Sequence, residues 1–168
     1  MNLEIKPLTP DLATDFFDFF DNRAFTDNSP MQPCYCCSDT MSEEQHKTDL
    51  FGQVEANGGG KEGFRHALRK CAERQIASSI LKGYLAFADG KAIGWCNAND
   101  KANYFRFDAF ILGNTVGRTK SIVCFEIAPE FRGQGVATAL LERVVSDAKA
   151  DGYAVVEGYP RLREDRKS

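Results

Sequence analysis

The stretch from residue 121 to 158 constrains the fold of this 168-residue chain more than any other part. Residues 121–127 are β-branched and aromatic, which predicts a strand, and residues 132–135 form a loop with two glycines. A long helix is predicted after the loop, and residues 153–157 predict a second strand. The helix is indicated by apolar residues at steps of four: Val136, Leu140, Val144 and Ala148. A strand, a crossover helix and a strand require parallel strands in one sheet.

The preceding sequence predicts further strands and helices of the same domain. Asp89-Gly90 between two apolar runs is a strong signal for a β-hairpin, because a type I′ turn needs two positive φ angles. We expect strands at residues 2–6, 84–88 and 91–97, and helices at 9–21, 42–55 and 61–81, the last closed by Gly83. The stretches 22–40 and 99–120 show no period and predict loops, and a loop as long as 22–40 is often functional. We expect a single domain over residues 1–168 with a mixed sheet.

Composition excludes several classes of function. The formal charge of −3 gives no electrostatic reason to expect nucleic acid or an anionic membrane as a partner. No apolar run approaches the roughly 20 residues that span a bilayer. The first residues lack the basic-then-apolar layout of a secretory signal, so we expect a cytoplasmic protein.

The glycine loop predicts a site for a phosphate group. The first N–H groups of a helix have no acceptor inside it, and the helix dipole adds partial positive charge there. Gly133 and Gly135 remove side chains, so that a phosphate can approach the backbone. The P-loop pattern is absent, and the dinucleotide pattern G-x-G-x-x-G is not met because its sixth position holds Thr138.

The pattern that does fit is R/Q-x-x-G-x-G/A, and with it residues 121–158 resemble the GNAT superfamily of acetyl-CoA-dependent N-acetyltransferases. Here it stands as Arg132-Gly133-Gln134-Gly135-Val136-Ala137. The resemblance implies an α/β fold with a mostly antiparallel central sheet, helices on both faces and a splayed strand pair. It also implies that acetyl-CoA binds through its pyrophosphate, without a metal. The implied cofactor-binding residues are Ile127, Arg132, Gly133, Gln134, Gly135, Val136, Ala137 and Thr138.

The same resemblance implies a reaction. Pantetheine would pair with the edge of the 121–127 strand near Ile127, and the primary amine of a small molecule would attack the thioester directly in a ternary complex. We expect Glu126 to be the base that deprotonates the amine, with Glu157 as an alternative. Structural ion pairing of Glu126 is an equally serious interpretation, because paired carboxylates are usually structural. A second functional hypothesis is an acyl-CoA-binding module without catalysis.

The cysteines support a third hypothesis. Cys34, Cys36 and Cys37 lie together in the 22–40 loop and could serve a thiol-based metal or redox protein. The spacing C-x-C-C lacks the usual C-x₂-C pair of a metal site, however, and so does not favour a metal. We expect instead that this loop lines the acceptor pocket, as the corresponding loop does in GNAT proteins.

The C-terminal end departs from the family. GNAT domains continue with a helix and two strands, and that helix commonly carries a tyrosine acting as general acid. Here only residues 158–168 follow the strand at 153–157, with a charged tail expected to be solvated and no tyrosine after Tyr159. Three explanations remain open: the C-terminal part of the domain is truncated, another subunit completes the sheet, or the protein works without that acid. An exposed edge at 153–157 would favour pairing with another chain, so we also expect a homodimer.

Overall fold

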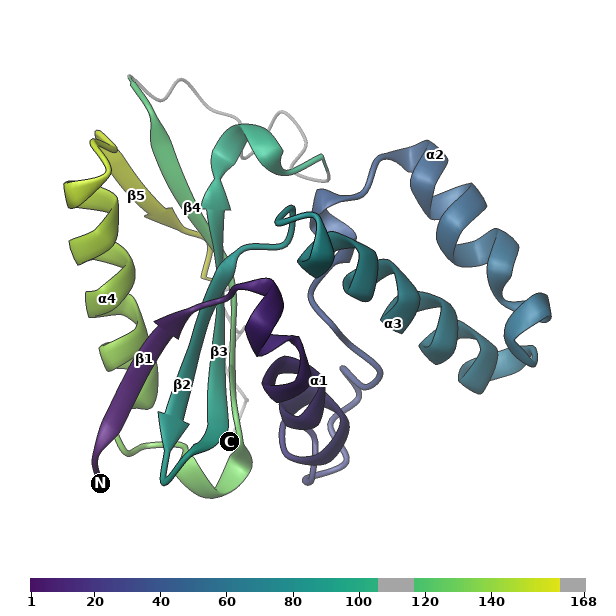
Figure 1. The fold of residues 1–168 in the computed structure, drawn as a ribbon, viewed down its shortest axis with the longest axis horizontal. Coiled ribbons are helices and arrows are strands. Elements are labelled where there is room, and N and C mark those ends of the chain that lie inside the picture. The colour runs from purple at the N-terminus through teal and green to yellow at the C-terminus, as the bar shows by residue number, and fades with distance from the viewer. Residues whose placement is uncertain (106–116, 161–168) are drawn as a thin grey trace, which may run out of the picture.

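The computed structural model describes residues 1–105 and 117–160, and they form one α/β unit (Figure 1). The strands are β1 Leu3–Pro7, β2 Gly83–Ala88, β3 Lys91–Asp100, β4 Thr119–Ile127 and β5 Val155–Gly158. The main helices are α1 Ala13–Asn22, α3 Gly60–Ala77 and α4 Val136–Ala150, with a short helix α2 at Glu43–Gln45. None of the helices in these ranges is long and apolar enough to cross a bilayer.

The strands form one mixed sheet in the order β1-β2-β3-β4-β5. The first three pairings are antiparallel, and β4 pairs with β5 in parallel across the α4 crossover, as the sequence predicts. The β2–β3 hairpin turns at Asp89 and Gly90, whose φ angles are 49° and 73°. Both angles are positive, as the predicted type I′ turn requires.

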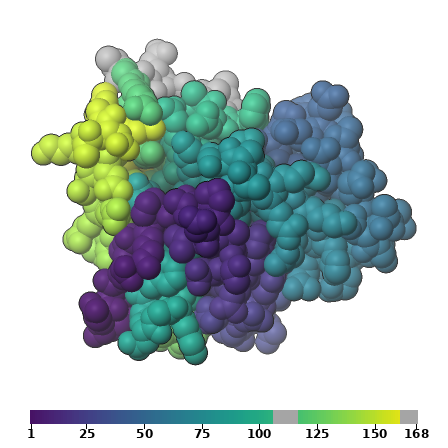
Figure 2. All heavy atoms as spheres, in the orientation of Figure 1, coloured from purple at the N-terminus to yellow at the C-terminus, as the bar shows by residue number. Residues whose placement is uncertain are grey.

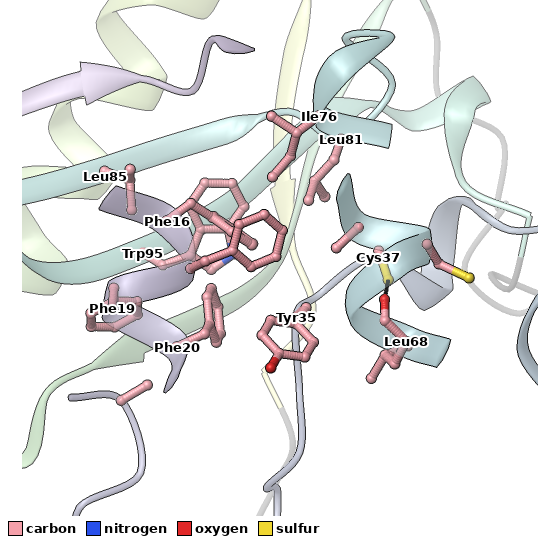
Figure 3. Close-up of a cluster of buried hydrophobic side chains, with 14 of the residues drawn as sticks. Phe16, Phe19, Phe20, Tyr35, Cys37, Leu68, Ile76, Leu81, Leu85 and Trp95 are labelled. Atoms are coloured by element: carbon pink, nitrogen blue, oxygen red, sulfur yellow. Dashed lines mark hydrogen bonds between the residues drawn. The ribbon is translucent and has the colours of Figure 1, made fainter. Parts of the chain in front are cut away.

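Helices cover both faces of the sheet (Figure 1). On one face, α1 and α3 bury an aromatic cluster against Trp95 of β3, whose side chain is fully buried. Phe16 and Phe20 of α1 meet the indole ring edge-on, with ring centroids 5.1 and 6.4 Å from it (Figure 3). On the other face, α4 buries Val136, Leu140, Val144 and Ala148, the residues that its periodicity singles out.

The predicted helices at 61–81 and 42–55 are both shorter in the structure than the sequence predicts. The helix at 61–81 ends at Ala77, and Gly83 is the first residue of β2 rather than the end of the helix. Gly83 is needed for another reason: a Cβ there would collide with the Trp95 ring and the carbonyl of Cys96. The segment 42–55 begins with the predicted capping box of Ser42 and Gln45, but its α-helix is only three residues long.

After α2 the chain continues through a π-helical turn at His46–Leu50 and 3₁₀ turns to Asn57. This segment and α3 extend away from the sheet as a lobe, seen in blue in Figure 2. The predicted irregular stretch is shorter than expected, because β3 runs to Asp100 and β4 begins at Thr119. Most of that stretch, including Phe107 and Phe110, and the charged tail from Arg161 lie outside the described residues.

Candidate active site

The glycine loop joins β4 to α4 through a short 3₁₀ turn at Pro129–Phe131. Gly133 and Gly135 adopt φ angles of 74° and 83°, which side chains rarely tolerate. A Cβ built on either glycine would meet nothing within 4 Å, so the space above the loop is free of protein atoms. A cavity of about 540 Å³ opens there, lined by the loop, Ile127 and the first turn of α4.

The start of α4 turns backbone donors toward this cavity. The first hydrogen bond within the helix runs from the N–H of Ala139 to the carbonyl of Gly135. Helix geometry therefore leaves the N–H groups of Val136, Ala137 and Thr138 without an acceptor inside the helix. These three residues line the cavity, whereas the Gln134 side chain bonds to the carbonyl of Glu130 at 2.7 Å. This is the setting in which a helix N-terminus binds a phosphate.

A second opening lies between β4 and β5. The two strands pair only from Thr119–Val155 to Ile122–Gly158, so β4 runs on past the end of β5 (Figure 1). Val123 has no partner in β3 either, because Asn97 pairs with Cys124 and Ala98 with Ile122. Because β5 pairs only with residues 119–122, the edge of residues 123–127 that faces away from β3 has no strand partner in the described parts of the chain. An apolar cavity of about 480 Å³ occupies the opening, walled by β4, β5 and α4.

Glu126 lies on the sheet face that carries α1 and α3, as the predicted alternation requires. It pairs with Trp95, whereas its neighbours Phe125 and Ile127 pair with Cys96 and Gly94 on the α4 side. Its side chain is 17% exposed. Burial raises the pKa of Glu126 above its usual value, and the nearby Arg132 charge lowers it in part.

Arg132 holds three groups with one guanidinium. Its Nη2 donates to Glu126 Oε1 at 3.3 Å, its Nη1 to Asp27 Oδ2 at 2.7 Å, and its Nε to the carbonyl of Ile127 at 3.0 Å. The side chain thus points toward a pocket of about 580 Å³ formed by residues 27–30, Phe125 and Glu126. Arg132 and Ile127 line both this pocket and the loop cavity.

Glu157, the alternative base, is engaged elsewhere. Lys101 Nζ lies 2.9 Å from Glu157 Oε2, and the Tyr159 hydroxyl donates to the same oxygen at 2.7 Å. Burial would raise the pKa of Glu157, but the hydrogen bonds from Lys101 and Tyr159 outweigh it and lower that pKa. Tyr159 also shares a 2.8 Å hydrogen bond with Ser121, and burial raises its pKa to about 12.

Several residues of these pockets were not identified by the sequence. Asp27 lies 105 positions from Arg132, and Lys101 lies 56 positions from Glu157. No local pattern marks either contact, because both arise where distant loops meet the ends of strands. The structure also brings Cys124 of β4 to Cys36, which contacts Cys34. Cys37 turns away, and its Sγ donates to the carbonyl of Leu68 (Figure 3). Among the described residues, no group of three or more His, Cys, Asp or Glu side chains is placed to hold a metal ion.

The fold and the loop define a mixed α/β protein in which the N-terminus of α4 opens on a cavity beside a split in the sheet. The model of the acetyltransferase (GNAT) family matches residues 60–159, which is more than half of the chain. The chain therefore belongs to the GNAT acetyltransferase family. No curated protein sequence matches the chain.

Solved structures show the same fold at low sequence identity. A ribosomal-protein-alanine N-acetyltransferase from Brucella melitensis biovar Abortus 2308 is 16% identical with a TM-score of 0.54, over 98% of this chain and 85% of the other. An aminoglycoside 6′-N-acetyltransferase, AAC(6′)-Ih from Acinetobacter baumannii, is 16% identical with a TM-score of 0.54, over 97% of this chain and 82% of the other. The aminoglycoside N-acetyltransferase AAC(6′)-Iy in complex with CoA is 16% identical with a TM-score of 0.54, over 95% of this chain and 78% of the other.

Proposed function

We propose that this protein transfers an acetyl group from acetyl-CoA to the primary amine of a small molecule, with both substrates bound at once. One observation carries the proposal beyond the family: the cavity between β4 and β5 and the pocket beside Glu126 share Phe125 as a wall. The thioester end of the pantetheine arm in that cavity and an amine at Glu126 would therefore lie on either side of one residue. That proximity is what a direct transfer requires.

The residues at the loop fit a CoA diphosphate. The two glycines leave a space that any Cβ would enter, and the first N–H groups of α4 supply donors without a local acceptor. Residues 133–138 would hold the diphosphate, and the unpaired edge of residues 123–127 would pair with the amide groups of the pantetheine arm. The apolar cavity between β4 and β5 would then take the end of that arm.

The chain contributes positioning and one proton acceptor to the reaction. The amine nitrogen forms a bond to the acetyl carbon and the carbon–sulfur bond breaks. The second proton that the nitrogen loses as the amide forms goes to the departing sulfur, so CoA leaves as the thiol. Glu126 would take the proton that the ammonium loses, because burial raises the pKa of its carboxylate toward neutrality. Holding the two substrates together can contribute about 7–11 kcal/mol to lowering the barrier. A backbone N–H near Ile127 would donate to the carbonyl oxygen as negative charge develops there.

The pocket beside Glu126 favours a small cationic acceptor. Its volume of about 580 Å³ falls within the range of about 300–1,000 Å³ usual for small-molecule sites. Asp27 and Glu126 present two carboxylates to it, and Arg132 offsets one of these charges. An ammonium group of the acceptor would compete with the guanidinium for them.

The proposal is tested with purified protein, acetyl-CoA and a panel of small amines that includes aminoglycosides and polyamines. Free CoA and acetylated amine should be separated and quantified by chromatography with mass detection, because the six cysteines of the protein would react in a thiol assay. We expect equal amounts of the two products for at least one amine. Calorimetric binding of acetyl-CoA without product from any amine would identify a CoA-binding module instead. Absence of binding would refute the site.

A further inference from the structure

Three thiols gather beside the proposed amine pocket without a part in the proposed reaction. The sulfur atoms of Cys34 and Cys36 lie 3.8 Å apart in the loop that follows α1. The Cys36 thiol also shares a hydrogen bond with Cys124 of β4, two residues before Glu126. All three cysteines are free and partly exposed.

The loop is held so that these two sulfur atoms face each other. Tyr35 between them is 2% exposed, and its hydroxyl donates to Asp21 Oδ1. Asn97 of β3 donates its Nδ2 to the carbonyl of Cys36 at 2.8 Å. Cys36 adopts a φ of 50°, in the left-handed region that a non-glycine residue seldom occupies without such support. The fold therefore holds the two thiols close together, and the loop loses little conformational entropy when they react.

The two thiols differ in reactivity. Hydrogen bonds from the thiol and the backbone N–H of Cys36 lower the pKa of Cys34, against burial and the Glu126 charge. Hydrogen bonds with Cys124 and Cys34, together with burial, raise the pKa of Cys36 well above its usual value. A thiolate is the reactive form of cysteine toward peroxide. The arrangement thus provides one thiol, Cys34, that reacts first with peroxide, and a neighbouring thiol, Cys36, that then forms a disulfide with it.

We propose that Cys34 and Cys36 are a redox-active dithiol pair, which a peroxide converts to a disulfide within the loop. The Cys34 thiolate attacks one oxygen of hydrogen peroxide, giving sulfenic acid at Cys34 and hydroxide. The Cys36 sulfur then attacks the Cys34 sulfur, and the Cys36 thiol proton and the departing hydroxyl leave as water. Two thiols are oxidised and one peroxide is reduced to two waters. The sulfur atoms must approach by roughly 1.8 Å, from 3.8 Å to the bonded length of about 2.0 Å.

The sequence allows this disulfide to be mapped without ambiguity. Trypsin cuts after Arg23 and Lys47 but at no site between them, so one peptide, 24–47, carries Cys34, Cys36 and Cys37. Cys124 lies on another peptide, 121–132. A Cys34–Cys36 bond leaves a single peptide that has lost two hydrogens, whereas a Cys36–Cys124 bond joins the two peptides.

The experiment oxidises folded, reduced protein with one equivalent of hydrogen peroxide, alkylates the remaining thiols and digests it. We expect the free thiols to fall from six to four, with Cys37 as the only alkylated cysteine in peptide 24–47. The disulfide should be absent in Cys36→Ser, where Cys34 should stop at the sulfenic acid, and it should be retained in Cys71→Ser, a control thiol that bonds to the carbonyl of Asp49. Three alkylated cysteines in that peptide, or a cross-link to 121–132, would overturn the proposal. The mapping needs no substrate, so its result stands apart from the proposed acetyl transfer.

A second measurement asks what the disulfide does, and this part rests on the proposed function. The loop with Cys34 and Cys36 also supplies residues 27–30 to the amine pocket. We expect oxidation to raise the KM for the amine at least threefold and to leave the Kd of acetyl-CoA unchanged. A KM that does not change between the reduced and the mapped, oxidised protein would exclude control of the pocket by the pair.

Discussion

Glu126 is subject to two opposing influences on its pKa. Burial raises that pKa, and Arg132 lowers it through its charge and its hydrogen bond at 3.3 Å. Asp27 and Cys34 also lie close enough to interact with the carboxylate. A base must be ionised to accept a proton, so the rate should rise with pH through the raised pKa of Glu126.

Substituting Glu126→Gln should therefore lower kcat/KM on the order of a hundredfold and remove the acidic limb of its pH profile. Acetyl-CoA should bind no more weakly than to the parent protein, because Glu126 is not among the residues proposed to hold the diphosphate and its loss frees the Arg132 guanidinium. The exposed Glu142 of α4 provides a matched control, and Glu142→Gln should leave both quantities unchanged. Retention of the acidic limb in Glu126→Gln would assign the limb to another group.

Arg132→Gln should move the acidic limb to higher pH. Loss of the positive charge leaves burial and the Asp27 charge to raise the pKa of Glu126, so more of the carboxylate is protonated at a given pH. Arg132→Lys keeps the charge and should hold the limb near its original position. The profile of kcat/KM against pH measures both variants, and a limb that moves downward in Arg132→Gln would contradict the assignment of Glu126.

The sheet face of Glu126 was predicted correctly from the sequence, because strand alternation is a local property. The register confirms that Glu126 pairs with Trp95 on the α1 side. The partners of Glu126 could not be predicted in the same way. Arg132 is part of the loop pattern, but its side chain reaches Asp27, and only the folded chain brings the loop of Asp27 to it.

At the scale of elements, local patterns predicted where structure begins better than how it continues. The capping box of Ser42 and Gln45 is present, yet α2 gives way to π and 3₁₀ turns after three residues. A cap satisfies the first N–H groups of a helix but does not decide its further course. In α4 the sequence also determines how far the helix continues, because its stripe of buried apolar residues packs on the sheet along the helix.

The element formed by the loop and α4 can be tested with two nearly isosteric substitutions. Asn and Asp both tolerate a positive φ better than other side chains, so Gly135→Asn and Gly135→Asp place similar bulk at a φ of 83°. Only Asp adds a negative charge where the diphosphate would bind. We expect calorimetry to find acetyl-CoA binding roughly tenfold to a hundredfold weaker in Gly135→Asp than in Gly135→Asn.

Gly152 provides a control for backbone strain, because it has a φ of 75° at the far end of α4 and a Cβ there would meet nothing within 4 Å. Gly152→Asp should bind acetyl-CoA as the parent protein does. Equal affinities in the two Gly135 variants would remove the electrostatic argument for the site.

At the scale of the whole molecule, the order of elements was predictable because each face of the sheet is covered by a helix with its own apolar stripe. The opening between β4 and β5 followed from the family resemblance and not from periodicity, since each strand is regular by itself. The cytoplasmic location remains a prediction from the sequence.

Association of two copies also remains a prediction, and β5 is where it would occur. Within the described residues β5 is the last strand of the sheet, so its outer edge presents unpaired N–H and C=O groups. We expect sedimentation equilibrium at micromolar concentration to give twice the chain mass of 18.7 kDa. Replacing Val156 by Pro removes one donor from β5 and should shift the equilibrium toward the monomer. A single species of 18.7 kDa in the parent protein would contradict this expectation.

The contacts of Arg132 have a consequence for how each substrate affects the binding of the other. The residue borders both cavities, and its guanidinium is bound to Asp27 and Glu126. A bound diphosphate that attracts the guanidinium frees both carboxylates for the ammonium group of the amine. In the same way, a bound ammonium group that displaces the guanidinium frees the guanidinium for the diphosphate. Thermodynamic reciprocity makes the two effects equal in size. Initial rates should therefore show each substrate lowering the apparent dissociation constant of the other by the same factor.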